Sequence, residues 1–310
     1  MNHFQPSPKM HRSAVMKSQH DRVAMLAGAH DVLGAQLLER CGYDGVWASS
    51  LEIAASYGKI DDDRLTMCNV LAVTAAMAGA VSIPVLADVG TGWGDDGDVS
   101  RVVSAFESVG AGGICMEDTA YPKCNSLLAG SRRLSNATSF ADRISTACAA
   151  RTNDSFLIFA RVEALVAGLG GEEALRRASL YGQAGADAIV IHAKTKCDEE
   201  VIEVVRSWQG TAPLVLIPTM YPTLSIDQME SYGTIGFVIY ANQGLRAAIG
   251  ATEAAMRQIQ ADRHAGGVDQ WIAPLGDLLS TQRELLEKEG RDKGLGSRQS
   301  FSAGRFERGH

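Results

Sequence analysis

The sequence contains no C-x-x-C pair, and its six cysteines lie far apart, at positions 41, 68, 115, 124, 148 and 197. This spacing favours free thiols in a reducing cytoplasm over a zinc site or a disulfide framework. No apolar run approaches the roughly 20 residues that span a bilayer. Residues 1–19 also lack the apolar segment of a signal peptide. We therefore expect a cytoplasmic protein without a membrane partner.

Positive charge is also scarce. The net charge is −7 at pH 7, and the isoelectric point lies near 5.5. This balance argues against a nucleic-acid partner, and any anionic small molecule would have to be attracted by cations placed locally. Hydrophobic residues, in contrast, make up 46% of the 310 positions. The chain can therefore bury a sizeable core, and it lacks the composition of a disordered protein.

Short apolar runs alternate with helical patterns along most of the chain. The runs are continuously apolar, as is typical of parallel strands buried on both faces. The residues between them repeat with a helical period, for example over 98–110 and 172–185. Eight strands alternating with helices predict a (β/α)8 barrel. A doubly wound open sheet is the alternative, but no G-x-G-x-x-G follows the first strand. The eight runs are 22–27, 45–47, 84–88, 112–116, 156–161, 188–191, 213–217 and 236–240.

The chain beyond the eighth run predicts additional helices. We expect an N-terminal extension over 1–20, the barrel over 21–264, a helical segment over 265–290 and a flexible tail over 291–310. The helical segment carries an apolar stripe that suits either an outside partner or the chain's own barrel. The stripe consists of Leu275, Leu278, Leu279 and Leu285.

Polar residues gather where the predicted strands end. In a barrel these ends converge on one pocket, so residues more than a hundred positions apart can meet there. Several polar ends on one rim indicate an active site. The residues concerned are Trp47, Ser49, Asp88, Glu117, Arg161, Glu163 and His192.

The fourth run leads into residues 117–126, which read EDTAYPKCNS. This stretch resembles the E-D-K-x-x-P-K-x-N-S signature of phosphoenolpyruvate mutases, in the isocitrate lyase superfamily. The resemblance implies that Glu117 belongs to a metal site and that Lys123, Asn125 and Ser126 lie on a gating loop. The carbon–carbon lyases of the superfamily have their catalytic cysteine at the position of Asn125, and phosphonopyruvate hydrolases lack the asparagine. Cys124 lies one position too early for that cysteine and is interpreted as a structural thiol.

Two further segments extend the resemblance on the substrate side. The family's W-G-S-G-L appears as WASSL, so Trp47, Ser49, Ser50 and Leu51 are expected to contact the substrate, with the serine and the following backbone amides holding its carboxylate. The family's catalytic aspartate, about ten residues on, matches Asp61 by spacing. Because two more aspartates follow Asp61, a slip of one residue is an open alternative.

The third strand departs from the family pattern at one position. The family's D-A-D-T-G-Y-G appears as DVGTGWG. The resemblance implies that Asp88 binds Mg²⁺ directly, whereas the second aspartate is replaced by Gly90. Mg²⁺ is held by few carboxylates and keeps several waters, so we expect weaker binding, with Asp95 or Asp96 as a compensating acid.

The fifth and sixth strands supply the family's R-x-E and its histidine. Arg161 and Glu163 match the first, and His192 matches the second. A guanidinium and an imidazole are suitable donors to a phosphoryl group in transit. We expect Arg161 and His192 to be catalytic, together with Asp61, Lys123 and Asn125. Ser126 and Glu163 are expected to contact the substrate.

Together these segments favour a Mg²⁺-dependent enzyme similar to phosphoenolpyruvate mutase. The resemblance implies a homo-oligomer, dimer or tetramer, whose final helix is exchanged between subunits. A phosphonopyruvate hydrolase, or a lyase of a 2-hydroxy- or alkylmalate, is the alternative on the same site. A barrel that binds a small acid without turnover, its metal site decayed at Gly90, is the alternative of another class.

Overall fold

A computed structural model describes residues 22–62, 64–93, 99–121, 123 and 133–280. Within these ranges, parallel strands close into a barrel in chain order, from β1 to β8. Residues 24–27 of β1 pair with residues 237–240 of β8, which closes the sheet. The predicted barrel is confirmed, and this closure excludes the open doubly wound sheet. The strands are β1 (Ala24–Ala29), β2 (Gly45–Ala48), β3 (Val85–Asp88), β4 (Gly113–Glu117), β5 (Leu157–Val162), β6 (Ala188–Ile191), β7 (Leu214–Leu216) and β8 (Ile235–Tyr240).

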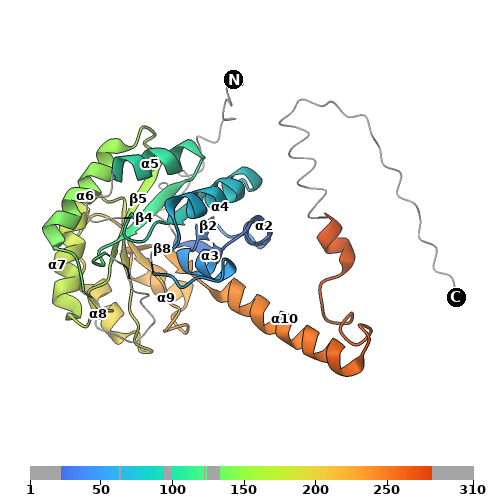
Figure 1. Cartoon of the computed structure of the whole chain (residues 1–310). Helices are drawn as coiled ribbons and strands as arrows, with labels where there is room; N and C mark the ends of the chain where they lie inside the picture. The colour runs from blue at the N-terminus through green and yellow to red at the C-terminus, as the bar shows by residue number, and fades with distance from the viewer. Residues whose placement is uncertain (1–21, 63, 94–98, 122, 124–132, 281–310) are drawn as a thin grey trace, which may run out of the picture. The chain divides into compact units, whose positions relative to one another are not determined.

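Helices alternate with the strands, and Figure 1 shows α5 to α8 outside the sheet. Several helices begin at a side-chain cap: the Asp31 carboxylate accepts from the Gly34 amide, and Ser49 accepts from the Glu52 amide. The helices are α2 (Val32–Arg40), α3 (Ser50–Ser56), α4 (Met67–Ala80), α5 (Val99–Ser108), α6 (Ala137–Ala150), α7 (Gly170–Gln183), α8 (Glu199–Ser207), α9 (Ile226–Ser231) and α10 (Gln243–Asp262).

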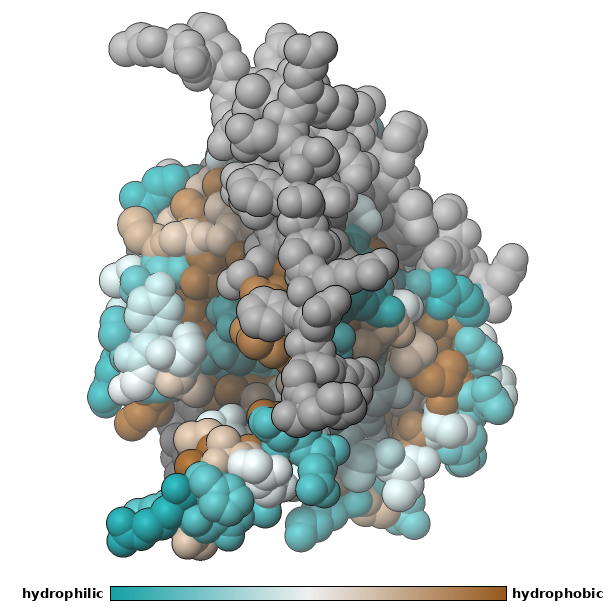
Figure 2. Space-filling view, turned by 90° about the vertical axis from the view of Figure 1, so that its right-hand side faces the viewer, coloured by the Kyte–Doolittle hydropathy of each residue, from teal (hydrophilic) through white to brown (hydrophobic). Residues whose placement is uncertain are grey.

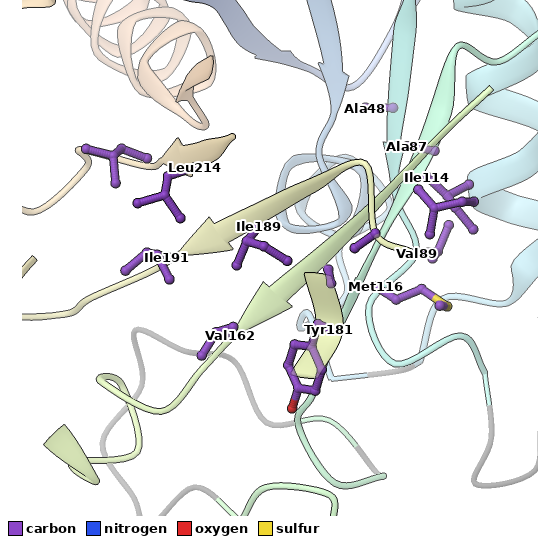
Figure 3. Close-up of a cluster of buried hydrophobic side chains, with 14 of the residues drawn as sticks. Ala48, Ala87, Val89, Ile114, Met116, Val162, Tyr181, Ile189, Ile191 and Leu214 are labelled. Carbon is purple, nitrogen blue, oxygen red and sulfur yellow. The ribbon is translucent and has the colours of Figure 1, made fainter. Parts of the chain in front are cut away.

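The core has two layers, one inside the barrel and one between sheet and helices. Strand β4 shows the division, because Cys115 points into the barrel interior whereas Ile114 and Met116 belong to the helix-side layer. Figure 3 shows this outer layer, in which Ile189 and Ile191 of β6 lie near Val162 of β5. Both faces of each strand are therefore buried, which explains why the runs are continuously apolar.

The chain divides into two compact units, Met1–Glu253 and Ala254–His310. The first contains the barrel. In the described part of the second, the end of α10 is followed by a turn and by a helical segment at 275–280. The indole N–H of Trp271 donates to Gln258 over 3.3 Å. Leu275, Leu278 and Leu279 are exposed there, whereas Leu285 lies outside the described residues.

Hydrophilic and apolar residues are interspersed over the face drawn in Figure 2. Among the described residues, no helix is both long and apolar enough to cross a membrane.

Candidate active site

The polar residues predicted at the strand ends do converge. A cavity of about 480 Å³ opens at the carboxyl ends of the strands. Of the predicted site residues, Trp47, Ser49, Leu51, Asp61, Asp88, Lys123, Arg161 and His192 line it. Ser50, Glu117 and Glu163 are buried and contact these lining residues. Asn125 and Ser126 lie outside the described residues.

Arg161 is held rigidly on the cavity wall. Its Nε lies 2.5 Å from Glu163 Oε1, and its Nη2 lies 2.8 Å from His192 Nδ1. Because a guanidinium can only donate, this contact makes Nδ1 an acceptor and leaves the imidazole proton on Nε2. His192 Nδ1 also lies 3.2 Å from Glu163 Oε1. Glu163 therefore fixes the Arg161 guanidinium, which in turn donates to the His192 ring.

Arg161 stays protonated despite its burial. Burial alone would lower the pKa of the guanidinium, but Glu163 and Glu117 outweigh it and keep the pKa above its ordinary value. Glu117 Oε2 lies 3.8 Å from Arg161 Nη1. Arg161 is therefore a fixed positive charge on the wall of the larger cavity.

A second cluster surrounds the Lys123 ammonium. Its Nζ donates to Asp61 Oδ1 over 3.0 Å and to Ser50 Oγ over 3.1 Å. Ser50 Oγ in turn donates to Asp88 Oδ2 over 2.8 Å, and Glu117 Oε2 lies 4.0 Å from Nζ. Burial lowers the pKa of Lys123, but the carboxylates overcome this effect and raise it above its ordinary value.

The acids of this cluster are suited to Mg²⁺. Asp88 and Glu117 supply buried oxygen donors, 5% and 1% exposed, and Mg²⁺ prefers one or two carboxylates with waters and substrate oxygens. Within the described ranges, no group of three or more His, Cys, Asp or Glu could hold a metal ion. An all-protein cage is therefore absent there, and Asp88 and Glu117 fit an open, water-rich site.

Gly90 adjoins these acids. Its φ is +53°, and its carbonyl accepts from the Glu117 amide over 2.9 Å. It lines a second cavity, of about 290 Å³, together with Asp61, Asp62, Asp88 and Lys123. Asp95 and Asp96, the acids expected to compensate for the missing aspartate, lie outside the described residues.

Asp118, which was given no role from the sequence, organises the wall behind the site. Its Oδ1 accepts from the Glu163 amide over 2.9 Å. Its Oδ2 accepts from Arg177 over 2.8 Å and from the Tyr181 hydroxyl over 2.7 Å. Burial raises the pKa of Asp118, against the opposing effects of Tyr181 and Arg177. Asp118 thereby ties the ends of β4 and β5 to α7 and positions Glu163.

Replacing Arg177 by methionine is expected to lower the free energy of unfolding by about 3–5 kcal/mol, because the buried Asp118 carboxylate loses its charged partner. Urea denaturation measures the loss. Arg176→Met is the matched control, since Arg176 is the neighbouring residue and pairs with Glu173 at the surface, where ion pairs contribute little. Equal losses in the two variants would contradict the role given to the Asp118 pair.

Two more polar residues missed by the sequence analysis line the larger cavity. Thr219 follows β7 and Asn242 follows β8. Thr219 Oγ1 and Asn242 Oδ1 are both buried and have no hydrogen-bond partner within the described structure. Both residues could have been identified as site candidates from the sequence, because each follows a predicted strand, as His192 does.

Comparison with known proteins identifies the family of the chain. The family model described as phosphoenolpyruvate phosphomutase matches residues 16–260. A phosphonopyruvate hydrolase of Variovorax sp. (strain Pal2) is 40% identical over 285 residues, which cover 89% of this chain and 96% of the relative. The phosphoenolpyruvate phosphomutase of Streptomyces hygroscopicus is 34% identical, over 86% of this chain and 84% of its own.

Solved structures agree in fold. The phosphoenolpyruvate phosphomutase of Streptomyces platensis subsp. rosaceus has a TM-score of 0.86 at 38% identity and covers 93% of this chain and 100% of its own. A phosphonopyruvate hydrolase in complex with oxalate and Mg²⁺ has a TM-score of 0.84 at 36% identity, with 92% and 98% covered. The chain therefore belongs to the phosphoenolpyruvate phosphomutase family, within the phosphoenolpyruvate mutase/isocitrate lyase superfamily.

Proposed function

We propose that the protein is a Mg²⁺-dependent phosphoenolpyruvate mutase, which interconverts phosphoenolpyruvate and 3-phosphonopyruvate. The observation that carries the proposal is a single cavity lined by Asp88, which is suited to a metal ion, and by Arg161 and His192, which are suited to a phosphoryl group. A substrate with a carboxylate at one end and a phosphoryl group at the other needs both a metal-binding acid and cationic or N–H donors in the same cavity.

The pyruvate half of the substrate would bind at the carboxyl ends of β2 and β3. Ser49 and the backbone amides that follow it would hold the carboxylate, beside Trp47 and Leu51 on the cavity wall. Asp88 and Glu117 would hold Mg²⁺, which when bound stabilises negative charge on the enolate oxygen. These groups keep the enolate in place while the phosphoryl group is detached from it.

Arg161, His192 and Asn125 would bind the phosphoryl half of the substrate. A phosphoryl group in transit is loose and metaphosphate-like, with its charge spread over three oxygens. The Arg161 guanidinium is already oriented by Glu163, so little reorganisation is needed when that charge develops. The His192 proton assigned to Nε2 provides a second donor. The bond from phosphorus to the enol oxygen breaks, and the bond from phosphorus to C3 forms, without net proton transfer.

A coupled assay separates this activity from its rivals. With phosphonopyruvate and Mg²⁺, a mutase should oxidise NADH only when pyruvate kinase, ADP and lactate dehydrogenase are all present. A hydrolase releases pyruvate, so lactate dehydrogenase alone would suffice. NADH oxidation that does not depend on pyruvate kinase would overturn the mutase proposal. Absence of turnover at any Mg²⁺ concentration would instead favour a binding protein.

Phosphonopyruvate hydrolysis is the second candidate, and one observation favours it. The Variovorax hydrolase shares 40% identity over 96% of its length, compared with 34% for the Streptomyces hygroscopicus mutase. The two reactions differ in whether water reaches the phosphoryl group. We prefer the mutase because Asn125 retains the residue that the family resemblance associates with mutases. A lyase is less favoured because Asn125 takes the position of the catalytic cysteine.

Gly90→Asp is expected to lower the half-saturating Mg²⁺ concentration by roughly tenfold, because outer carboxylates typically change metal affinity by about 10–100-fold. Aspartate is among the residues that tolerate the positive φ of this position. Gly90→Asn is the matched control, since it adds the same bulk without charge. The readout is turnover against Mg²⁺ concentration, and equal half-saturation in the wild type and Gly90→Asp would contradict the expectation.

A further inference from the structure

The ammonium group of Lys123 lies close to both acids that are proposed to hold the metal. Its side chain is 4% exposed, and its Nζ donates to Asp61 and to Ser50. Ser50 is hydrogen-bonded directly to Asp88, and Glu117 lies 4.0 Å from Nζ. Lys123 therefore contacts, directly or through one hydroxyl, both acids that would hold Mg²⁺.

The electrostatics of this arrangement favour competition. Arg161, another buried cation of the described site, is held at 2.5 Å by Glu163 and lies 3.8 Å from Glu117. Lys123 therefore compensates Asp61 and, through Ser50, Asp88, and it shares Glu117 with Arg161. A divalent ion held by Asp88 and Glu117 would meet this positive charge a few ångströms away in a buried setting, where charges repel far more strongly than in water.

The cavities give the ammonium a place to move. Lys123, Asp61 and Asp88 line both the larger cavity and the cavity beside Gly90. A side chain at this junction can leave its partners without crossing the packed core. Gly90 adds no carboxylate here. The single positive charge of Lys123 therefore offsets a larger share of the local negative charge than it would if position 90 were an acid.

We propose that Lys123 is a built-in competitor for the divalent metal. In the metal-free protein its ammonium compensates Asp61 and the Asp88–Ser50 pair, and it leaves them when the metal binds. The inference rests on the metal site of the proposed function, but not on which reaction the enzyme performs.

Calorimetric titration of chelator-treated protein with MgCl₂, without substrate, provides the first test. Lys123→Met should bind Mg²⁺ at least tenfold more tightly than the wild type. Lys123→Arg, which retains the charge, and Lys196→Met, which removes an exposed charge elsewhere, should both bind as the wild type does. Equal or weaker binding by Lys123→Met would overturn the proposal, as would an equal gain in Lys196→Met.

Amine labelling of the wild type provides a second test that needs no variant. A succinimidyl acetate pulse followed by peptide mass spectrometry should modify Lys123 several-fold faster with saturating Mg²⁺ than without it, while exposed Lys59 and Lys196 stay unchanged. Mg²⁺-independent labelling of Lys123 would overturn the displacement even if Lys123→Met fails to fold. Because neither test uses turnover, failure of the mutase assay and failure of this inference are separate results.

Discussion

Asp88→Ala should lower Mg²⁺-dependent turnover of phosphonopyruvate by at least about a hundredfold. Removing a residue that only supports a metal ligand typically costs about 10–100-fold, and Asp88 is proposed to bind the metal itself. The fold should survive, because Asp88 lies at the end of β3 and its side chain accepts, within the described residues, only from the Ser50 hydroxyl and from the Gly90 amide. Neither bond joins the core layers.

Asp88→Asn separates the charge from the hydrogen bonds. The amide keeps an oxygen that can accept from the Gly90 amide, as Asp88 Oδ1 does over 3.1 Å, but it is a far poorer Mg²⁺ ligand. Both variants should lose turnover, and circular dichroism should show an intact barrel. Wild-type turnover in either variant at limiting Mg²⁺ would refute the metal assignment.

Asn125→Ala should lower isomerisation at least roughly a hundredfold, because losing one donor to a developing charge typically raises the barrier by about 2.7–4 kcal/mol. It should also change the products. An amide can donate to the phosphoryl oxygens and is too weak a base to activate water, whereas alanine leaves room for a solvent molecule. Residual turnover should therefore yield more pyruvate and phosphate relative to phosphoenolpyruvate.

The product ratio from phosphonopyruvate tests this expectation. Asn125→Asp is the matched variant, since it has the same shape but brings a negative charge toward the phosphoryl oxygens and should lower isomerisation further. An unchanged rate and ratio in Asn125→Ala would mean that this amide does not touch the group in transit. The mutase proposal would then lose the residue that distinguishes it from the hydrolase.

The barrel could be predicted from the sequence because the strands are continuous apolar runs that alternate with helical patterns. The predicted boundaries of the strands were less accurate. The first strand was expected at 22–27 and is observed at Ala24–Ala29, because its end is set by pairing with β2, where Ala29 lies opposite Ala48. Such pairing joins segments far apart in the chain and leaves no local signal.

The positions of candidate site residues were predictable where a polar residue stands at a strand end or in a family motif, as with Asp88, Arg161 and His192, and their roles stay predictions. Contacts between residues far apart in the chain were not predictable. Lys123 and Ser50 are 73 residues apart, and Arg177 and Asp118 are 59 apart. Arg177 lies in the middle of a helix, where a buried cation looks in sequence like any solvated charge. Only the packing of α7 against the ends of β4 and β5 reveals its role.

Phosphorus NMR of the purified wild type, mixed with phosphonopyruvate and Mg²⁺, tests the central claim most directly. A mutase should replace the phosphonate signal with the phosphate-ester signal of phosphoenolpyruvate. With phosphoenolpyruvate as the starting material, the same enzyme should catalyse the reverse reaction. Formation of inorganic phosphate without phosphoenolpyruvate would contradict the account and identify a hydrolase, and an unchanged phosphonate signal would contradict catalysis itself.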